Sequence, residues 1–347
     1  DTAHSALGWR QLQRRYSCSS YGHRTDSSLT RLSVQSFRRG LVPRFLWRSI
    51  FSLRICWLGL SFANLHGFDR HMIWQTSRFA IDLARPQVMG IVNVTPDSFS
   101  DGGRYGSTAA ALRHCEQLLK EGADILDIGG ESTRPGSPAV PLDEELSRVV
   151  PLVREAVTLG VPISVDTYKP EVMRAVLDLG ADIVNDIWAL RQPGAAAAVA
   201  VHPLCGVCLM HMHRDPQTMQ QAPMDGDVVP QVLSFLELQA HNLLALGVEK
   251  TRILLDAGIG FGKTVEQNFA LLARHSELLA AGYPLLAGWS RKSSLGAVTG
   301  LEVDQRMVPS VAAAVLAVER GAAVVRVHDV RETVAALAVW SAMQRSG

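Results

Sequence analysis

The feature that most constrains the fold is a regular alternation of short β-rich runs with longer helical patterns from Gln87 onward. Eight β-rich runs occur, at 88–93, 124–128, 163–166, 183–186, 206–210, 253–256, 284–287 and 324–327. Helical patterns separate or follow them, including 108–120, 143–159, 170–179, 230–246, 265–279, 309–320 and 331–343. Such alternation is typical of βα units around a parallel sheet. Eight units in about 260 residues, with no Gly-x-Gly-x-x-Gly fingerprint after the first run, predict an α/β fold of the (β/α)8 TIM-barrel type rather than an open doubly wound sheet.

Polar residues recur where these runs end. They are Asn93, Asp127, Asp166, Asn185, Asp256 and His328, and Lys292 lies in the loop after the seventh run. The carboxyl ends of barrel strands meet on one face, where the active sites of this fold lie. The sequence therefore predicts that these side chains share one site.

The first 71 residues differ from the rest of the chain. They contain eleven arginines, no lysine and three acids, a balance of +8, whereas 72–347 carries 23 basic and 30 acidic residues, a balance of −7. We expect a catalytic domain at 72–347 and, at 1–71, a disordered or non-native upstream extension with the natural start near Met72. The alternative is a targeting segment, because an Arg- and Ser-rich, acid-poor stretch is typical of transit peptides.

Charge and cysteine content exclude several classes of partner. An acidic body of −7 has no reason to attract nucleic acid. The most apolar stretch of the extension, 41–65, is interrupted by arginines and leaves no run near the ~20 residues that a membrane span needs. Five irregularly spaced cysteines indicate a reducing compartment and hence a cytoplasmic protein.

Two loops have compositions suited to ligands. The first, 90–103, reads GIVNVTPDSFSDGG. It is longer than the roughly 2 to 6 residues usual between strand and helix, and we expect it to present polar atoms over a ligand. The second, 127–137, reads DIGGESTRPGS, and its hydroxyls and Arg134 are suited to an anion.

The middle strands predict a site for a flat heterocycle. Asp166, Asn185 and Asp186 offer acceptors and donors that converge on one point. A structural carboxylate paired with lysine is the alternative.

The segment 256–264, DAGIGFGKT, comes within one position of a Walker A loop, but Ala257 stands where the first glycine is required. We predict instead that its glycines shape a tight loop beside Asp256 with Phe261 as an apolar wall. His211 and His213, near two cysteines, are too crowded in one strand to favour a zinc site.

The last two loops predict a phosphate site, as is common after strands seven and eight of this fold. GWSRKSSLG contributes Arg291 and Lys292, and VRVHDV contributes Arg326 and His328. With Asn93, these residues form a candidate cradle for pyrophosphate. For Arg291 alone, a solvated charge cluster is the alternative.

Taken in order, the motifs NVTPDSFSDGG, GGESTRPGS, VDTYKPEV, VNDI, LMHMH, GIGFGK, SRKS and VRVHDV resemble the signatures of the dihydropteroate synthase family over nearly all of 72–347. The resemblance implies a transferase that condenses 6-hydroxymethyl-7,8-dihydropterin pyrophosphate with p-aminobenzoate, uses Mg2+, forms a homodimer and is inhibited by sulfonamides. One departure is Ala257, where the family usually has proline.

The resemblance also implies roles for individual residues. The pterin ring would be held by Asp166, Asn185, Asp256 and Lys292, which are also the candidate catalytic residues. Asn93 would lie beside Mg2+, and Arg326 and His328 would bind the pyrophosphate. The p-aminobenzoate pocket would be bounded by Thr133, Arg134, Pro135, Phe261 and Ser293, and the closing first loop would carry Asp97, Phe99 and Asp101.

Two other functions share parts of this pattern. A pterin-binding methyltransferase barrel that uses methyltetrahydrofolate needs the same Asp and Asn residues, but not STRPG, SRKS or the terminal Arg-x-His. A pterin-binding module without catalysis would not require candidates at every ligand position. The anion-binding loops therefore favour the synthase.

Overall fold

The computed structural model describes residues 72–94, 103–132 and 136–346, with the side chains of 103–107 left out. The extension expected at 1–71 lies outside the described residues. Two antiparallel strands, β1 (Ile73–Gln75) and β2 (Ala80–Asp82), precede a closed parallel barrel in the order β10-β3-β4-β5-β6-β7-β8-β9.

The barrel strands confirm the predicted TIM barrel. Their boundaries differ from the expected runs by no more than two residues. They are β3 (Gln87–Asn93), β4 (Ile125–Gly129), β5 (Ile163–Asp166), β6 (Ile183–Asp186), β7 (Gly206–Met210), β8 (Ile253–Asp256), β9 (Leu285–Ala287) and β10 (Ala322–Val327).

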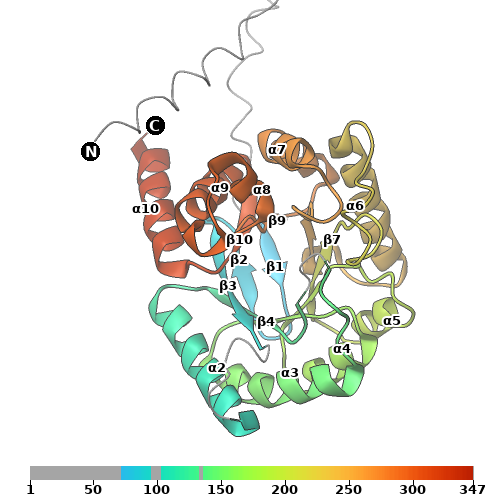
Figure 1. Cartoon of the computed structure of the whole chain (residues 1–347). Helices are drawn as coiled ribbons and strands as arrows, with labels where there is room; N and C mark the ends of the chain where they lie inside the picture. The colour runs from blue at the N-terminus through green and yellow to red at the C-terminus, as the bar shows by residue number, and fades with distance from the viewer. Residues whose placement is uncertain (1–71, 95–102, 133–135, 347) are drawn as a thin grey trace, which may run out of the picture. The chain divides into compact units, whose positions relative to one another are not determined.

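Helices form a ring around the strands (Figure 1). They are α2 (Gly103–Lys120), α3 (Leu142–Ala156), α4 (Pro170–Asp178), α5 (Ala195–Ala200), α6 (Val228–Ala245), α7 (Val265–Ala273), α8 (Ser293–Thr299), α9 (Met307–Glu319) and α10 (Val330–Ser346). The sequence did not predict the two short helices α5 and α8. In the described part of the chain, no helix is both long enough and apolar enough to cross a membrane.

Alternation along each strand separates the core from the site. Successive side chains point to opposite faces of a strand, so residues two apart share a face. Ile125, Ile183, Leu254 and Val324 belong to the inner core cluster. Two residues further along the same strands stand Asp127, Asn185, Asp256 and Arg326. An apolar layer therefore fills the barrel, and a polar layer lies above it toward the carboxyl ends.

The hairpin of β1 and β2 closes the amino-terminal end. Trp74 is fully buried with Ile81 and Leu83 in the same cluster as the inner barrel residues. Its indole N–H donates to the backbone oxygen of Arg252 at 3.0 Å. The plugged end leaves the carboxyl ends of the strands as the open face.

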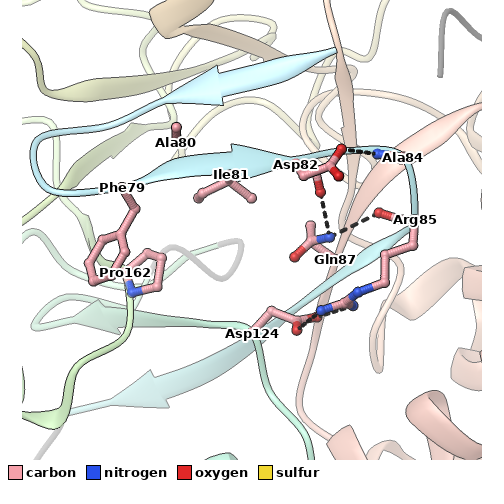
Figure 2. A pocket seen from close by; sticks show the side chains of 9 residues that line it. All are labelled: Phe79, Ala80, Ile81, Asp82, Ala84, Arg85, Gln87, Asp124 and Pro162. Atoms are coloured by element: carbon pink, nitrogen blue, oxygen red, sulfur yellow. Dashed lines mark hydrogen bonds and ion pairs between the residues drawn. The ribbon is translucent and has the colours of Figure 1, made fainter. Parts of the chain in front are cut away.

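A cavity of about 490 Å³ lies between the hairpin and the amino ends of the barrel strands (Figure 2). Arg85 spans it and binds the Asp124 carboxylate through both terminal nitrogens, at 2.6 and 3.1 Å. Gln87 donates to the backbone oxygens of Asp82 and Arg85, both at 2.9 Å. Because these polar groups bind one another across the cavity, they tie the hairpin to the barrel. They lie at the opposite end of the barrel from the polar layer.

Candidate active site

The centre of the polar layer is an ion network that joins strands far apart in sequence. Arg326 donates from Nε to Asp127 Oδ2 at 2.5 Å and from Nη2 to Asp166 Oδ2 at 2.7 Å. The Ser164 hydroxyl donates to Asp127 Oδ1 at 2.6 Å, and the Asn185 amide lies 3.3 Å from Asp127 Oδ2. The guanidinium is therefore held in place by two carboxylates at the floor of the barrel mouth.

This floor is acidic and shielded from water. One guanidinium is shared by the Asp127 and Asp166 carboxylates. Burial raises the pKa of Asp166, and the charge of Arg326 opposes that shift. Burial also raises the pKa of Asp256, although the Gly258 N–H and the positive charges of Lys292 and Lys263 act against it. A floor of carboxylates and an amide is suited to a ring that presents N–H donors.

The turn after β8 has the conformation that its glycines predict. Gly258, Gly260 and Gly262 have φ values of +66°, +83° and +71°. A Cβ at Gly258 would lie 1.8 Å from the backbone oxygen of His211, so no other residue fits there. The Gly258 N–H donates to Asp256 Oδ1 at 2.7 Å and fixes that carboxylate at the rim.

Lys292 and Phe261 lie side by side at the same rim. Lys292 is the residue that precedes α8, and Ser293 is the first residue of that helix. The Lys292 ammonium lies 4.3 Å from the centre of the Phe261 ring, within the range of a cation–π contact. The predicted apolar wall and the predicted ring-binding lysine are thus neighbours.

The loops after β9 and β10 meet through His328. Its Nδ1 lies 2.9 Å from the Ser290 hydroxyl, and its backbone N–H donates to the same oxygen at 3.1 Å. Arg291, which has a φ of +58°, binds Asp329 at 2.6 Å. Arg291 is therefore a structural ion pair, whereas His328 remains a candidate for the anion.

Asn93 lies at the end of β3, opposite Gly129 in the ladder with β4. Its side-chain oxygen is about 4.0 Å from the position that a Cβ on Gly129 would take. Asp166 Cβ and Oδ2 lie 3.5 and 3.9 Å from the same position, so Asn93 and Asp166 border the same part of the mouth.

Asp186 does not join the site. Its carboxylate accepts the N–H groups of Trp188 and Leu190, at 2.7 and 2.8 Å. Ala189 and Leu190 both have positive φ, and the two hydrogen bonds hold that strained turn. Burial raises the pKa of Asp186 to about 7. Asp186 is thus a structural carboxylate, held by backbone N–H groups instead of the lysine that the alternative for this group expected.

Several predicted residues lie outside the described residues, namely Thr133, Arg134, Pro135, Asp97, Phe99 and Asp101. Both sides of the second loop are described. The Ser132 and Ser137 hydroxyls are 3.2 Å apart, and Glu131 accepts from Lys169 at 2.5 Å and from Tyr168 at 3.0 Å. The stem of that loop is therefore tied to the loop after β5.

Sequence reasoning missed three contributors. Asp127 was placed at the rim without a role, yet it is the main partner of Arg326. Ser290 orients His328. Lys263 is 3 % exposed and lies behind the turn after β8. For Asp127 the inward-facing register two residues after Ile125 was an available signal; for Lys263 the sequence held none.

Together, the barrel, the acidic and amide floor and the adjacent cations define the class of protein as a (β/α)8-barrel enzyme with one site at the carboxyl ends. Comparison with known proteins agrees. The model of the pterin binding enzyme family matches residues 89–328. The dihydropteroate synthase of Neisseria meningitidis serogroup B is 51% identical over 280 residues, which is 79% of this chain and 98% of that protein. The dihydropteroate synthase of Escherichia coli K12 is 48% identical over 261 residues, 75% of this chain and 92% of that protein.

Solved structures give the same result. Burkholderia cenocepacia dihydropteroate synthase complexed with 7,8-dihydropteroate is 52% identical, with a TM-score of 0.72 over 80% of this chain and 98% of its own. The Yersinia pestis dihydropteroate synthase with a sulfonamide drug is 45% identical, with a TM-score of 0.75 over 80% of this chain and 100% of its own. The chain belongs to the pterin-binding enzyme family and, within it, to the dihydropteroate synthases.

Proposed function

We propose that this chain condenses 6-hydroxymethyl-7,8-dihydropterin pyrophosphate with p-aminobenzoate to give 7,8-dihydropteroate and pyrophosphate. The observation that carries the proposal is the buried floor of Asp166, Asn185 and Asp256 beside the cations Lys292 and Arg326. Relatives about half identical in sequence have been solved with 7,8-dihydropteroate bound.

The floor binds the pterin ring. Asp166, Asn185 and Asp256 face the inside of the barrel from three strands, and their oxygens accept hydrogen bonds from the amino and ring N–H groups of the pterin. Lys292 donates to the ring from the rim. Because these side chains are buried and fixed by neighbours, the ring is oriented with its exocyclic methylene toward the anion-binding loops.

His328, Arg326 and Asn93 surround the pyrophosphate. Arg326 has five N–H donors, and two of its nitrogens bind Asp127 and Asp166 in this structure. A phosphate oxygen would be bound through the remaining donors. Ser290 fixes the orientation of the His328 ring, so that its Nε2 faces away from the Ser290 hydroxyl.

Asn93 also fits the role of a magnesium ligand. Mg2+ prefers oxygen ligands and is commonly held by one or two protein groups, substrate phosphates and water. In the described residues no cluster of three or more His, Cys, Asp or Glu could hold a metal. The ion would neutralise charge on the departing pyrophosphate.

The chemistry is a dissociative substitution. The bond between the exocyclic carbon and the ester oxygen breaks, and pyrophosphate takes the electron pair. Asp256 stabilises the positive charge that develops on the pterin. The neutral aryl nitrogen of p-aminobenzoate then attacks the carbon and releases a proton, so no general base and no covalent enzyme intermediate are required.

The p-aminobenzoate ring lies against Phe261 and Ser293; the roles expected for Thr133, Arg134 and Pro135 fall outside the described residues. Phe261 is 6 % exposed and backed by the cluster of Ile187, Met210, Met212 and Met219. A wall supported in this way gives a flat aromatic ring a fixed apolar surface. A sulfonamide, which presents the same ring, binds here in competition with p-aminobenzoate.

We also propose that the protein is a homodimer in the cytoplasm. Large apolar side chains are exposed on α8, α9 and α10, namely Val298, Val308, Leu316, Val339 and Met343. A second copy would cover them. Sedimentation velocity should give twice the chain mass, and Val308→Glu should shift the protein toward the monomer. A monomeric wild type would contradict the proposed dimer.

The cysteines support the proposed compartment. Those of the described region, Cys115, Cys205 and Cys208, are all unpaired, as in reducing compartments.

The purified full-length chain, incubated with both substrates and Mg2+, tests the activity. The proposal expects pyrophosphate release that depends on p-aminobenzoate, with equimolar 7,8-dihydropteroate detected by mass spectrometry. Methyl transfer from methyltetrahydrofolate without this reaction would establish the methyltransferase alternative. Pterin binding without either reaction would establish a non-catalytic module.

A further inference from the structure

A buried lysine lies behind the turn that carries Phe261. Lys263 is 3 % exposed, and its ammonium is not paired with a carboxylate among the contacts of the described residues. It lies 2.8 Å from the backbone oxygen of Gly258, 3.1 Å from that of Phe261 and 2.9 Å from His211 Nδ1. An ammonium has three N–H donors, which matches these three acceptors, and the backbone oxygen of His211 lies further away at 3.5 Å. Burying an unpaired charge is costly unless every donor is satisfied. The three acceptors around Lys263 meet that requirement, so the buried ammonium links them to one another.

His211 is prepared as an acceptor. Burial, with the charge of Lys263 adding to it, lowers the pKa of His211 to about 2, so the ring is neutral. When the ammonium donates to Nδ1, the ring proton must be on Nε2. The His211 ring also packs edge-on against Phe235 of α6, with 4.8 Å between ring centres. The contacts of the Lys263 ammonium therefore join two parts of the structure. One of them, His211, is anchored in the barrel wall by its packing against Phe235.

The second part that the Lys263 ammonium contacts is the turn after β8. Gly258 and Phe261 are the first and last residues of a tight turn in which the Phe261 N–H donates to the Gly258 oxygen at 3.1 Å. Lys263 binds the carbonyl oxygens of both. The same turn fixes Asp256 through the Gly258 N–H and places the Phe261 ring under Lys292. Lys263 is thus connected to the site while remaining out of reach of a ligand.

We propose that Lys263 is a positioning residue for p-aminobenzoate: its buried ammonium joins His211 on the barrel wall to the turn at 258–261 and so fixes the Phe261 wall. This inference rests on the proposed function. Without the ammonium, two backbone oxygens and His211 Nδ1 lose their donor, and Phe261 is no longer held in one place. Affinity for p-aminobenzoate then falls more than affinity for the pterin, which is held mainly by the separate floor.

The charge state of Lys263 adds a second readout. Burial lowers the pKa of Lys263 to about 7, although Asp256 on β8 acts in the opposite direction and Lys292 adds to the lowering. The other titratable group packed on it is His211, directly after β7, which stays neutral near pH 7. A neutral amine has only two donors for the three acceptors. The KM for p-aminobenzoate should therefore rise as the pH increases through 7 to 9.

The matched control is Arg252. It is also 3 % exposed, and its guanidinium donates to the backbone oxygens of Cys205, Pro203 and Val199. These contacts lie at the opposite end of the barrel, next to the hairpin. Arg252→Met removes a buried cation of the same kind and reports the general effect of lost stability.

The experiment compares Lys263→Met and Arg252→Met with the wild type, below the unfolding temperature of each. For Lys263→Met we expect at least a tenfold increase in the KM for p-aminobenzoate and in the Kd of a sulfonamide, and less than a threefold change in the KM for the pterin substrate. Lys263→Gln, which keeps donors, should recover part of the loss, and Arg252→Met should change neither constant. An unchanged KM for p-aminobenzoate in Lys263→Met, or an equal increase in Arg252→Met, would overturn the proposal.

Two outcomes remain distinct from these. If Lys263→Met does not fold, the wild-type pH profile decides, and a KM for p-aminobenzoate that is flat from pH 6 to 9 contradicts the role. If the wild-type enzyme itself shows no condensation, the proposed function fails rather than the role of Lys263.

Discussion

Replacing Arg326 with methionine tests whether the ion network at the barrel floor has the energetic role that its geometry implies. The substitution removes the cation and keeps an apolar side chain of comparable length. Asp127 is fully buried and Asp166 is 8 % exposed, so both carboxylates would lose their ionic partner out of reach of bulk water. Breaking a buried ion pair on one side costs about 3 to 5 kcal/mol. Because the Arg326 side chain is itself 21% exposed, we expect a loss of about 3 kcal/mol.

The loss should depend on pH in a defined direction. Burial raises the pKa of Asp166 to about 7, and Arg326 opposes that shift. Without Arg326 the pKa rises further, so the folded variant binds protons that the unfolded chain, with an Asp pKa of about 3.9, releases. Stability then falls as the pH rises through this window, by up to about 1.4 kcal/mol per pH unit for each proton. The free energy of unfolding of Arg326→Met should therefore differ more from that of the wild type at pH 8 than at pH 6.

Urea denaturation followed by tryptophan fluorescence at pH 6, 7 and 8 measures both effects. As a control, Asp127→Asn in the Arg326→Met background removes one of the two carboxylates and should recover part of the stability. A variant as stable as the wild type at pH 8 would refute the reasoning. An equal loss of stability at all three pH values would mean that the substitution acts through packing and not through charge.

The remaining predictions concern catalysis and inhibition. Asp256→Asn retains an acceptor for the Gly258 N–H and should fold normally, but kcat/KM should fall about 10² to 10³-fold because the charge that stabilises the pterin cation is gone; full turnover, measured as pyrophosphate release, would contradict the role. Asn93→Ala should raise the Mg2+ concentration needed for half-maximal velocity, and an unchanged Mg2+ titration would remove Asn93 from the metal site. Sulfonamides should raise the apparent KM for p-aminobenzoate at constant kcat; inhibition that added p-aminobenzoate does not relieve would contradict a shared pocket.

The barrel could be predicted from sequence because its repeat is local. Each unit carries its own strand and helix pattern, and few folds are compatible with eight consecutive units of this kind. The hairpin of β1 and β2 was not predicted, because three-residue strands have no measurable period and its position is set by Trp74 filling the barrel end. The short helix α8 was missed for a similar reason.

The positions of the site residues were more predictable than their contacts. Strand ends meet by topology, so Asp166, Asn185 and Asp256 could be assigned to one face. The pairing of Arg326 with Asp127 could not, because it joins β10 to β4 across 199 residues and depends on the register of a closed barrel. The roles of Thr133, Arg134 and Pro135 stay predictions.

Lys263 illustrates what sequence leaves out. A lysine directly before the helix N-cap Thr264 would ordinarily be assigned to the surface. Its burial follows from three acceptors that the fold brings together, one directly after the strand β7 and two on the turn. Such a position is a tertiary property that no local pattern encodes.

We propose that the polar layer at the carboxyl ends of the strands binds the pterin ring. A crystal structure of the protein with 6-hydroxymethyl-7,8-dihydropterin pyrophosphate and Mg2+ tests it directly. We predict density for the ring in contact with Asp166, Asn185 and Asp256, with the phosphates toward His328. Density in the amino-terminal cavity of Figure 2, or away from these three residues, would contradict it.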